Sequence, residues 1–169
     1  MVLSVDGKST KADLNDQSWA SPEDQKHLSK LISENNLILM GGNTYELAKS
    51  HIKTSAEKLR IVVTRDPAQF SEDEIKDQLE FVNKPLHELI SRLEDRGYNQ
   101  MLLLSGENLN KEFFEQNFIS EIYLTIEPKI FGSGKKMLVE SVLDINLKLL
   151  SLEKLNENGT ILLHYQVLK

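Results

Sequence analysis

The sequence of 169 residues contains no cysteine, and this absence excludes disulfides, zinc–thiolate sites and thiol nucleophiles. A basic stripe is absent too: the net charge is −6, with acidic and basic residues interspersed, which argues against a nucleic-acid partner. No apolar run approaches the length of a membrane span, and the N-terminus lacks the basic, apolar and small-residue order of a signal peptide. We therefore expect a cytoplasmic protein that binds neither nucleic acid nor membrane.

The sequence also lacks histidines spaced as the ligands of a metal site. The histidines are dispersed, and none has a second histidine or a carboxylate at ligand spacing: His27, His51, His87 and His164. A metal site needs several such ligands close together. We therefore expect no metal centre.

Short apolar runs alternate with segments of helical spacing along the chain. The runs predict strands over 1–5, 37–40, 59–64, 79–82, 101–104, 121–126, 145–152 and 160–168. Helices are predicted over 22–34, 45–50 and 85–96, with a further helix ending near 117. This alternation predicts an α/β fold in three layers, with a mostly parallel mixed sheet and helices on both faces. The length favours one domain over 1–169, and the turn at 156–159 predicts a C-terminal antiparallel hairpin.

The strand at 37–40 leads directly into Gly41, Gly42, Asn43 and Thr44, and then into a helix. A glycine turn between a strand and a helix directs free backbone N–H groups toward an anion. A tight turn without a ligand would have the same sequence, so both interpretations stay open. The spacing matches neither the dinucleotide-binding glycine pattern nor a P-loop.

A second turn of this kind, at 105–108, follows the strand at 101–104. Ligands of open α/β sheets bind at the carboxyl ends of strands. If the strands at 37–40 and 101–104 are neighbours, two turns rich in N–H groups face one crevice, an arrangement that suits a nucleotide with two phosphate groups.

The predicted helix at 22–34 begins with a capping signal. Ser21 is the expected N-cap, Pro22 the first helical residue, and Asp24 the acidic residue at the third position.

Several segments resemble known families in their order and spacing. Three resemble dihydrofolate reductase: WASPED (19–24), LILMGGNTYE (37–46) and IYLT (122–125). Three others resemble the related reductase domain of the riboflavin-pathway deaminase/reductase: SVDGK (4–8), SGENL (105–109) and IEPKIFGSG (126–134). The resemblance spans nearly the whole chain. It implies an eight-stranded mixed sheet, NADPH as the hydride donor and a homodimer.

The resemblance also places three groups of residues at the cofactor. The first would contact the pyrophosphate: Gly41, Gly42, Asn43 and Thr44. The second would hold the adenosine 2′-phosphate: Thr64 and Arg65. The third would lie beside the nicotinamide ribose and phosphates, with a cis bond before its glycine: Ser105, Gly106, Glu107, Asn108 and Leu109.

Arg65 has two interpretations. A guanidinium group at the 2′-phosphate would make bidentate contacts that favour NADPH over NADH. A solvated loop cation is the alternative.

On the substrate side, the resemblance makes Asp24 the acid beside the heterocycle and Thr125 its polar companion. Hydride transfer to such a ring needs a proton delivered nearby, whereas helix capping alone also accounts for Asp24. Trp19 would line the substrate pocket. The alternative is that it only packs the preceding loop against the helix at 22–34. Asp6 and Lys8 lie where riboflavin-type reductases hold substrate, although Asp6 followed by glycine is also an ordinary turn.

Two departures bear on the activity. The riboflavin-pathway enzymes have an acid just before two glycines, and this chain has Leu104 and Ser105 in place of the acid and the first glycine. These departures favour the alternative given below. From the resemblance as a whole we predict an NADPH-dependent reductase of a pteridine- or pyrimidine-type heterocycle, similar either to the riboflavin-pathway uracil reductase or to dihydrofolate reductase. The alternative is a non-catalytic nucleotide-binding homologue of the same fold.

Overall fold

The structure is a computed structural model that describes residues 1–14 and 18–169. Within these residues, eight strands form two four-stranded sheets, in the orders β1-β6-β8-β7 and β4-β3-β2-β5. The chain divides into two compact units, and each unit contains one sheet. We call residues 1–29 with 107–169 the mixed unit, and residues 30–106 the parallel unit.

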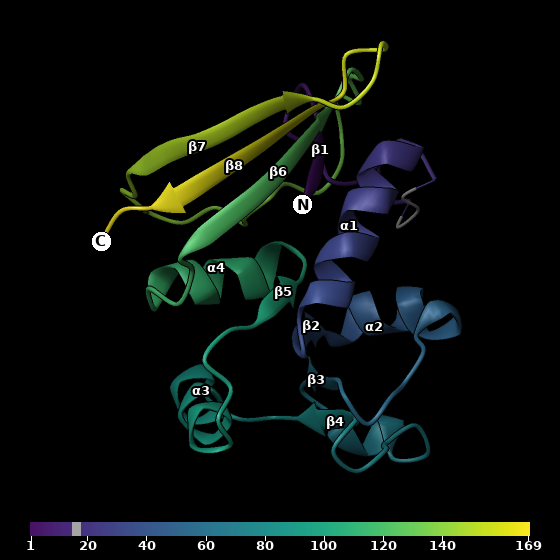
Figure 1. Ribbon diagram of the computed structural model, residues 1–169, viewed down its shortest axis with the longest axis vertical. Coiled ribbons are helices and arrows are strands. Elements are labelled where there is room, and N and C mark those ends of the chain that lie inside the picture. The colour runs from purple at the N-terminus through teal and green to yellow at the C-terminus, as the bar shows by residue number, and fades with distance from the viewer. Residues whose placement is uncertain (15–17) are drawn as a thin grey trace. The chain divides into compact units, whose positions relative to one another are not determined.

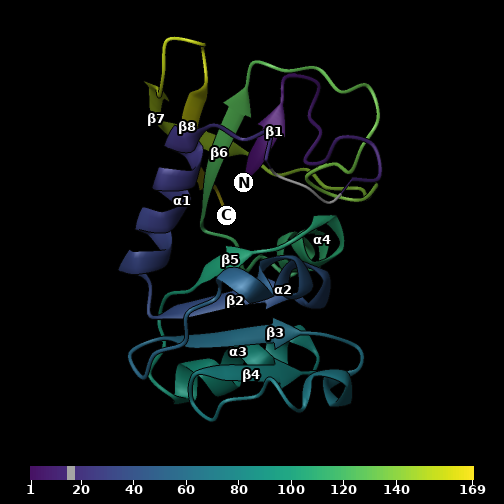
Figure 2. The same cartoon turned by 90° about the vertical axis from the view of Figure 1, so that its right-hand side faces the viewer.

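The strands of the parallel unit are β2 (Leu37–Gly41), β3 (Leu59–Val63), β4 (Leu79–Val82) and β5 (Leu102–Leu104). Its helical elements are α2 (Gly42–Ala48), η1 (Lys49–His51), η2 (Pro67–Phe70) and α3 (Leu86–Asp95). All neighbouring strands pair in parallel, and α2 and α3 lie on opposite faces of this sheet (Figures 1 and 2). Strands covered on both faces need apolar side chains on both faces. The adjacent residues Ile61 and Val62 of β3 point to opposite faces, and both are fully buried.

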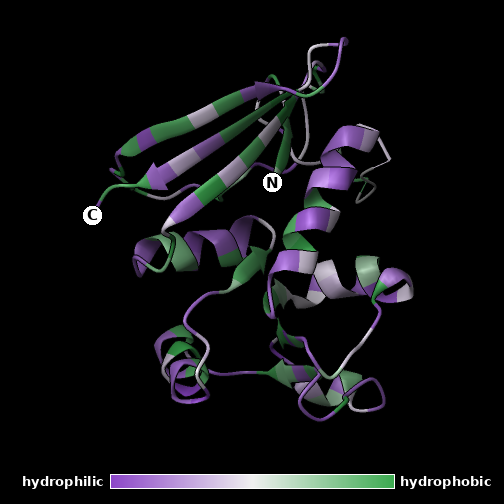
Figure 3. Ribbon diagram, viewed as in Figure 1, coloured by the Kyte–Doolittle hydropathy of each residue, from purple (hydrophilic) through white to green (hydrophobic). Residues whose placement is uncertain are grey.

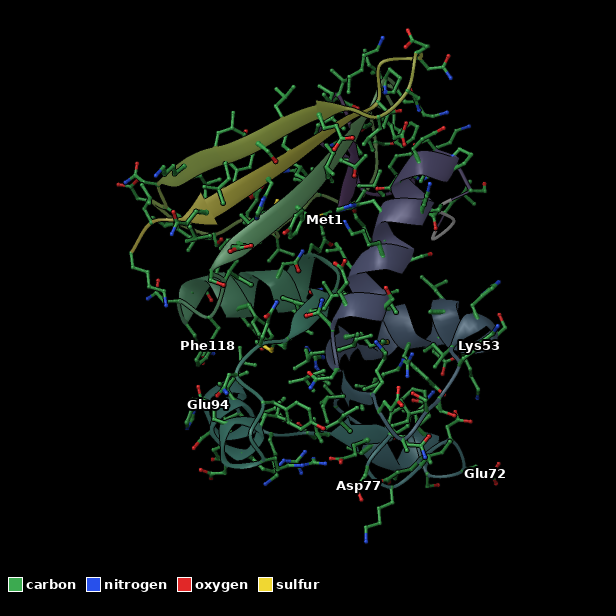
Figure 4. All side chains as sticks on the ribbon, in the orientation of Figure 1. Met1, Lys53, Glu72, Asp77, Glu94 and Phe118 are labelled. Carbon is green, nitrogen blue, oxygen red and sulfur yellow. The ribbon has the colours of Figure 1, made fainter. Side chains whose placement is uncertain are left out.

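The mixed unit contains β1 (Val2–Ser4), β6 (Glu121–Glu127), β7 (Leu147–Lys154) and β8 (Ile161–Val167). It also contains α4 (Glu107–Glu115) and the first turns of α1 (Pro22–Glu34). β1 runs parallel to β6, whereas β8 is antiparallel to both β6 and β7. The buried Phe113 ring contacts Phe118, which is labelled in Figure 4, with the two ring centroids 6.2 Å apart.

The predicted fold class is confirmed, including the C-terminal antiparallel hairpin of β7 and β8. One expectation was wrong: the described strands form two sheets of four instead of one mixed sheet of eight. β1 and β5 are each an edge strand of their own sheet and have only three residues each, so these two edges offer few backbone groups for pairing. Across the described residues, no helix is both long enough and apolar enough to cross a bilayer.

Candidate functional site

The carboxyl ends of three strands meet at one edge of the parallel sheet, which we call the carboxyl edge. β2 pairs with β3, so that Gly41 lies opposite Val63. β2 also pairs with β5, so that Met40 lies opposite Leu104. The condition set by the sequence is therefore confirmed: the two turns rich in N–H groups leave neighbouring strands at the same edge.

The turn after β2 lies directly against the end of β3. A Cβ atom added to Gly42 would be 3.4 Å from both Cβ and Oγ1 of Thr64, so a side chain at position 42 would fill the space between these segments. Gly41, Gly42 and Thr44 are half-buried, whereas Asn43 is exposed. The edge thus presents backbone groups and short polar side chains.

The segment that carries Arg65 is held by the strand next to it. Thr64 donates its backbone N–H to the Val82 carbonyl at 2.9 Å, and the Asn83 side-chain amide donates to the Arg65 carbonyl at 2.9 Å. The Arg65 side chain is exposed. Sequence reasoning missed Asn83, although its position directly after the predicted strand 79–82 places it at the same edge.

The turn after β5 differs in one respect from what the resemblance implied. The bond between Ser105 and Gly106 is trans, so the implied cis bond is absent. A non-proline cis bond costs about 3 kcal/mol, and the chain here takes the ordinary form. A Cβ atom added to Gly106 would meet nothing within 4 Å, which leaves its backbone open to a ligand.

Glu107, Asn108 and Leu109 follow Gly106 in the chain and form the first turn of α4, in the mixed unit. Glu107 accepts a hydrogen bond from the Lys136 backbone N–H at 3.1 Å. Asn108 is exposed and Leu109 is half-buried. These three residues therefore belong to a different unit from the other predicted cofactor residues.

Asp24 is buried in the first turn of α1, with 6% of its surface exposed. Its backbone N–H donates to Ser21 Oγ at 3.3 Å, which confirms the predicted N-cap. In a capping box the acidic third residue would in turn accept the N–H of the N-cap residue. This second bond is absent, because the Ser21 N–H donates to Glu127 Oε1 at 2.7 Å and not to Asp24. Among the described residues, the Asp24 carboxylate accepts only one hydrogen bond, from Gln25 Nε2 at 3.3 Å.

Thr125, like Asp24, lies in the mixed unit. It occupies the middle of β6 with 2% of its surface exposed, and its N–H donates to the Met1 carbonyl at 2.8 Å. Burial lowers the pKa of the Met1 amino group, and the charge of Asp24 acts in the opposite direction. Thr125 is thus hydrogen-bonded to Met1, and the charge of Asp24 acts on the Met1 amino group.

The Asp6 carboxylate is occupied by contacts within the protein. Oδ1 accepts hydrogen bonds from Ser4 Oγ at 2.6 Å and Phe131 N at 3.1 Å, and Oδ2 accepts one from Gly132 N at 2.7 Å. The Ser4 hydroxyl and then the Phe131 amide hold the pKa of Asp6 at about 2. Asp6 therefore ties the turn after β1 to the loop at 128–136.

Trp19 and Lys8 lie in the same unit. Trp19 packs edge-to-face on Phe131, with ring centroids 4.9 Å apart, and lines a pocket of ≈ 580 Å³ together with Glu127 and Asn156. Trp19 Nε1 is buried without a partner among the described residues. The Lys8 backbone N–H donates to Ser4 Oγ at 2.9 Å.

Glu127 is the second residue that sequence reasoning missed. Only 2% of its surface is exposed, and its carboxylate accepts hydrogen bonds from the Ser21 N–H and from Thr160 Oγ1, each at 2.7 Å. The signal available in the sequence was an acidic residue ending the IYLTIE strand, but the partners of Glu127 are distant along the chain.

Comparisons with known proteins agree with this architecture. The family model of the RibD C-terminal domain matches residues 1–161. The uncharacterized protein YyaP of Bacillus subtilis is 23% identical over 155 residues, covering 87% of this chain and 80% of YyaP.

Two solved structures share the fold. A pyrimidine reductase-like protein from Corynebacterium diphtheriae has a TM-score of 0.78 at 14% identity, covering 99% of this chain and 90% of that chain. A diaminohydroxyphosphoribosylaminopyrimidine deaminase/5-amino-6-(5-phosphoribosylamino)uracil reductase from Thermotoga maritima has a TM-score of 0.70 at 17% identity. That match covers 98% of this chain and 54% of the other.

Proposed function

We propose, since this chain belongs to the RibD C-terminal domain family, that it is a reductase using NADPH to reduce a pyrimidine- or pteridine-type heterocycle. Membership of the family supports a reductase role of the riboflavin-pathway type. The hydride donor and the substrate class are our proposal. The observation that carries it is the carboxyl edge, where the turns after β2, β3 and β5 come together.

The residues of the carboxyl edge fit a phosphorylated dinucleotide. Gly41, Gly42, Asn43 and Thr44 would contact the pyrophosphate through backbone N–H groups and short side chains. Ser105 and Gly106 would contact the cofactor from the neighbouring turn. NADPH, when bound, supplies the hydride.

Arg65 would select the phosphorylated cofactor. Its guanidinium group is exposed, and its backbone is held by Asn83. A planar guanidinium forms paired, charge-assisted hydrogen bonds with a phosphate. We therefore assign the preference for NADPH over NADH to Arg65, with the Thr64 hydroxyl beside it.

Asp24 and Thr125 would serve the substrate. Reduction of a ring of this class consumes a proton as well as a hydride, and Asp24 is a buried carboxyl group that the protein leaves largely unpaired. Thr125 would orient a polar ring atom. Trp19 would line the substrate pocket and Lys8 would bind substrate, whereas Asp6 would act by holding the loop at 128–136.

The experiment is calorimetric titration of the full chain with NADPH and with NADH. Arg65→Ala should weaken NADPH binding about tenfold and leave NADH binding unchanged, because only NADPH carries the 2′-phosphate. Lys76→Ala is the matched control, since it removes an exposed cation that precedes β4 in the same unit. Equal weakening of both cofactors by Arg65→Ala would contradict the assignment.

A non-catalytic nucleotide-binding role is the second candidate. It is favoured by Leu104, where the riboflavin-pathway enzymes carry an acid, and by Ser105 in place of the first glycine. Turnover assays with dihydrofolate and with the phosphoribosylaminouracil substrate separate the two candidates. NADPH binding without oxidation in the presence of any such heterocycle would favour this second role.

A further inference from the structure

Tyr45, the residue after the turn at 41–44, is anchored in the core of the parallel unit. It belongs to α2, and only 2% of its surface is exposed. Its ring packs edge-to-face against Phe70 and Phe81, with centroids 5.5 and 5.0 Å away, and those two rings stack on each other at 4.9 Å. Figure 3 shows the strands around this cluster as largely hydrophobic. The packing of three aromatic rings therefore fixes the position of α2 against the sheet.

The Tyr45 hydroxyl also forms a hydrogen bond with the Asp73 side chain. Burial and then this bond raise the pKa of Tyr45 to about 12, so the hydroxyl keeps its proton at neutral pH and donates it to Asp73. The same carboxylate accepts a second hydrogen bond from Lys49 Nζ at 2.6 Å. Because Lys49 directly follows α2, Asp73 holds this helix from its middle and from the residue after its end.

Asp73 lies on the segment that follows Arg65 in the chain, which we call the Arg65 segment (64–73). This segment leaves the carboxyl end of β3 and passes through η2 before it reaches Asp73. The Asp73 backbone N–H donates to the Phe70 carbonyl at 2.9 Å, so the carboxylate is fixed to the end of η2. Because Phe70 also packs on Tyr45, α2 is joined to the Arg65 segment by ring packing and by the bonds of Asp73.

This connection sets the spacing between two groups of proposed cofactor residues. The turn at 41–44, which would contact the pyrophosphate, directly precedes Tyr45. Arg65, which would contact the 2′-phosphate, lies on the Arg65 segment. In NADPH one ribose joins these two phosphate groups, so their separation is limited. A protein that holds both contact sites at the matching separation binds more tightly, because less ordering is needed on binding.

We propose that Asp73 is a positioning residue for cofactor selection. By bonding α2 to the Arg65 segment, it holds Arg65 at the distance from the turn at 41–44 that the 2′-phosphate requires. The inference rests on the proposed function, since it takes the turn and Arg65 to contact one cofactor. Asp73 acts through Tyr45 and Lys49 on one side and through η2 on the other.

The test is a double-mutant cycle, read as the ratio of the NADH to the NADPH dissociation constant in calorimetric titrations of the full chain. Arg65→Ala should lower this preference for NADPH about tenfold. Asp73→Asn keeps the size of the side chain but removes the charge that Lys49 bonds, and should lower the preference about fivefold. In the Asp73→Asn background, Arg65→Ala should cost only about a further twofold, because a misplaced guanidinium already contributes little.

The ratio separates positioning from a purely structural role. Loosening of α2 alone would weaken NADPH and NADH equally, because both contain the pyrophosphate. Tyr45→Phe keeps the ring in the aromatic cluster and removes only the hydroxyl, and should lower the preference about threefold. Asp77→Asn is the matched control in the same unit. Asp77, labelled in Figure 4, has a 68% exposed side chain that pairs with Arg96 at 3.1 Å, and its substitution should leave the ratio unchanged.

The outcomes distinguish this inference from the proposed function. A wild-type chain that binds neither nucleotide, or binds both equally, would overturn the proposed cofactor and the inference with it. A wild-type preference that depends on Arg65 but survives in Asp73→Asn would overturn the inference alone, as would losses that multiply in the double variant. Circular dichroism checks the fold of each variant, and if Asp73→Asn does not fold, the ratio for Tyr45→Phe decides.

Discussion

Asp24 and Glu127 are both buried carboxylates of the mixed unit, with 6% and 2% of their surfaces exposed, yet their hydrogen bonding differs. Glu127 accepts short bonds from the Ser21 N–H and the Thr160 hydroxyl. Asp24 accepts one long bond from Gln25 among the described residues. Burying a carboxylate is unfavourable unless hydrogen bonds compensate, so the protein satisfies one of these groups and leaves the other available.

The two carboxylates therefore have different roles at the N-terminus of α1. Because Glu127 takes the Ser21 N–H, the Asp24 carboxylate is not needed for capping. The role of Asp24 as a proton source remains our proposal, and this bonding is compatible with it. A third buried charge, Arg60 in β3 of the parallel unit, is less well satisfied still: its Nη1 has no partner among the described residues.

The largest expected effect follows from Asp24→Asn. The amide keeps the size of the side chain but cannot donate a proton as the acid does, so kcat for heterocycle reduction should fall at least about a hundredfold. NADPH affinity and the free energy of unfolding should change little. Steady-state kinetics with calorimetric titration measure both; Glu34→Gln, an acid-to-amide change at the exposed end of α1, is the control. A variant with wild-type kcat would remove Asp24 from the mechanism.

Glu127→Gln should show the opposite pattern. The new amide group cannot replace both charge-assisted hydrogen bonds, so the free energy of unfolding should fall by about 2 kcal/mol. Urea denaturation measures this. Glu157→Gln, in the hairpin turn with a 97% exposed side chain, should cause no measurable loss. If Glu127→Gln were as stable as wild type, the hydrogen bonds of Glu127 would not contribute to the free energy of unfolding.

Arg60→Met extends the comparison to the parallel unit. Burial lowers the pKa of Arg60, and an apolar side chain of similar length removes an incompletely bonded charge. The free energy of unfolding should rise by about 1 kcal/mol. Arg96→Met should lower it instead, because Arg96 bonds to Glu80 at 2.8 Å and to Asp77 at 3.1 Å. Destabilisation by Arg60→Met would indicate a partner for the guanidinium group.

The smallest effect concerns pH. The pKa of Asp6 lies below its ordinary value of 3.8, at about 2, so the folded state favours the charged carboxylate. Its contribution to stability is present above pH 3.8 and is lost as the pH falls toward 2. Urea denaturation of Asp6→Asn across this range should show a weaker acid dependence than wild type, while Asp13→Asn, at an exposed position, should match wild type. Parallel curves for Asp6→Asn and wild type would show that Asp6 does not bind the loop more tightly when charged.

Most of the fold could be predicted because its signals are local. Apolar runs indicated every strand, and the helix over 22–34 was predicted with the bounds that the structure gives it. The shared carboxyl edge needed only one condition, that β2 and β5 are neighbours, and this condition is met. The site was less predictable. Asn83 depends on the pairing of β3 with β4, and Glu127 on a contact with Ser21 across 106 residues.

The amino-acid sequence by itself determined the strands, the helices and the polar turns that end them. The spacing of apolar residues, helix capping and turn chemistry all involve residues that are close together in the chain. Only the tertiary structure decided which buried carboxylate receives two short hydrogen bonds, and where the bulge shifts the register of β7 with β8. Burial and hydrogen bonding join residues that the sequence holds far apart, and a single added residue in a strand moves every later side chain to the other face.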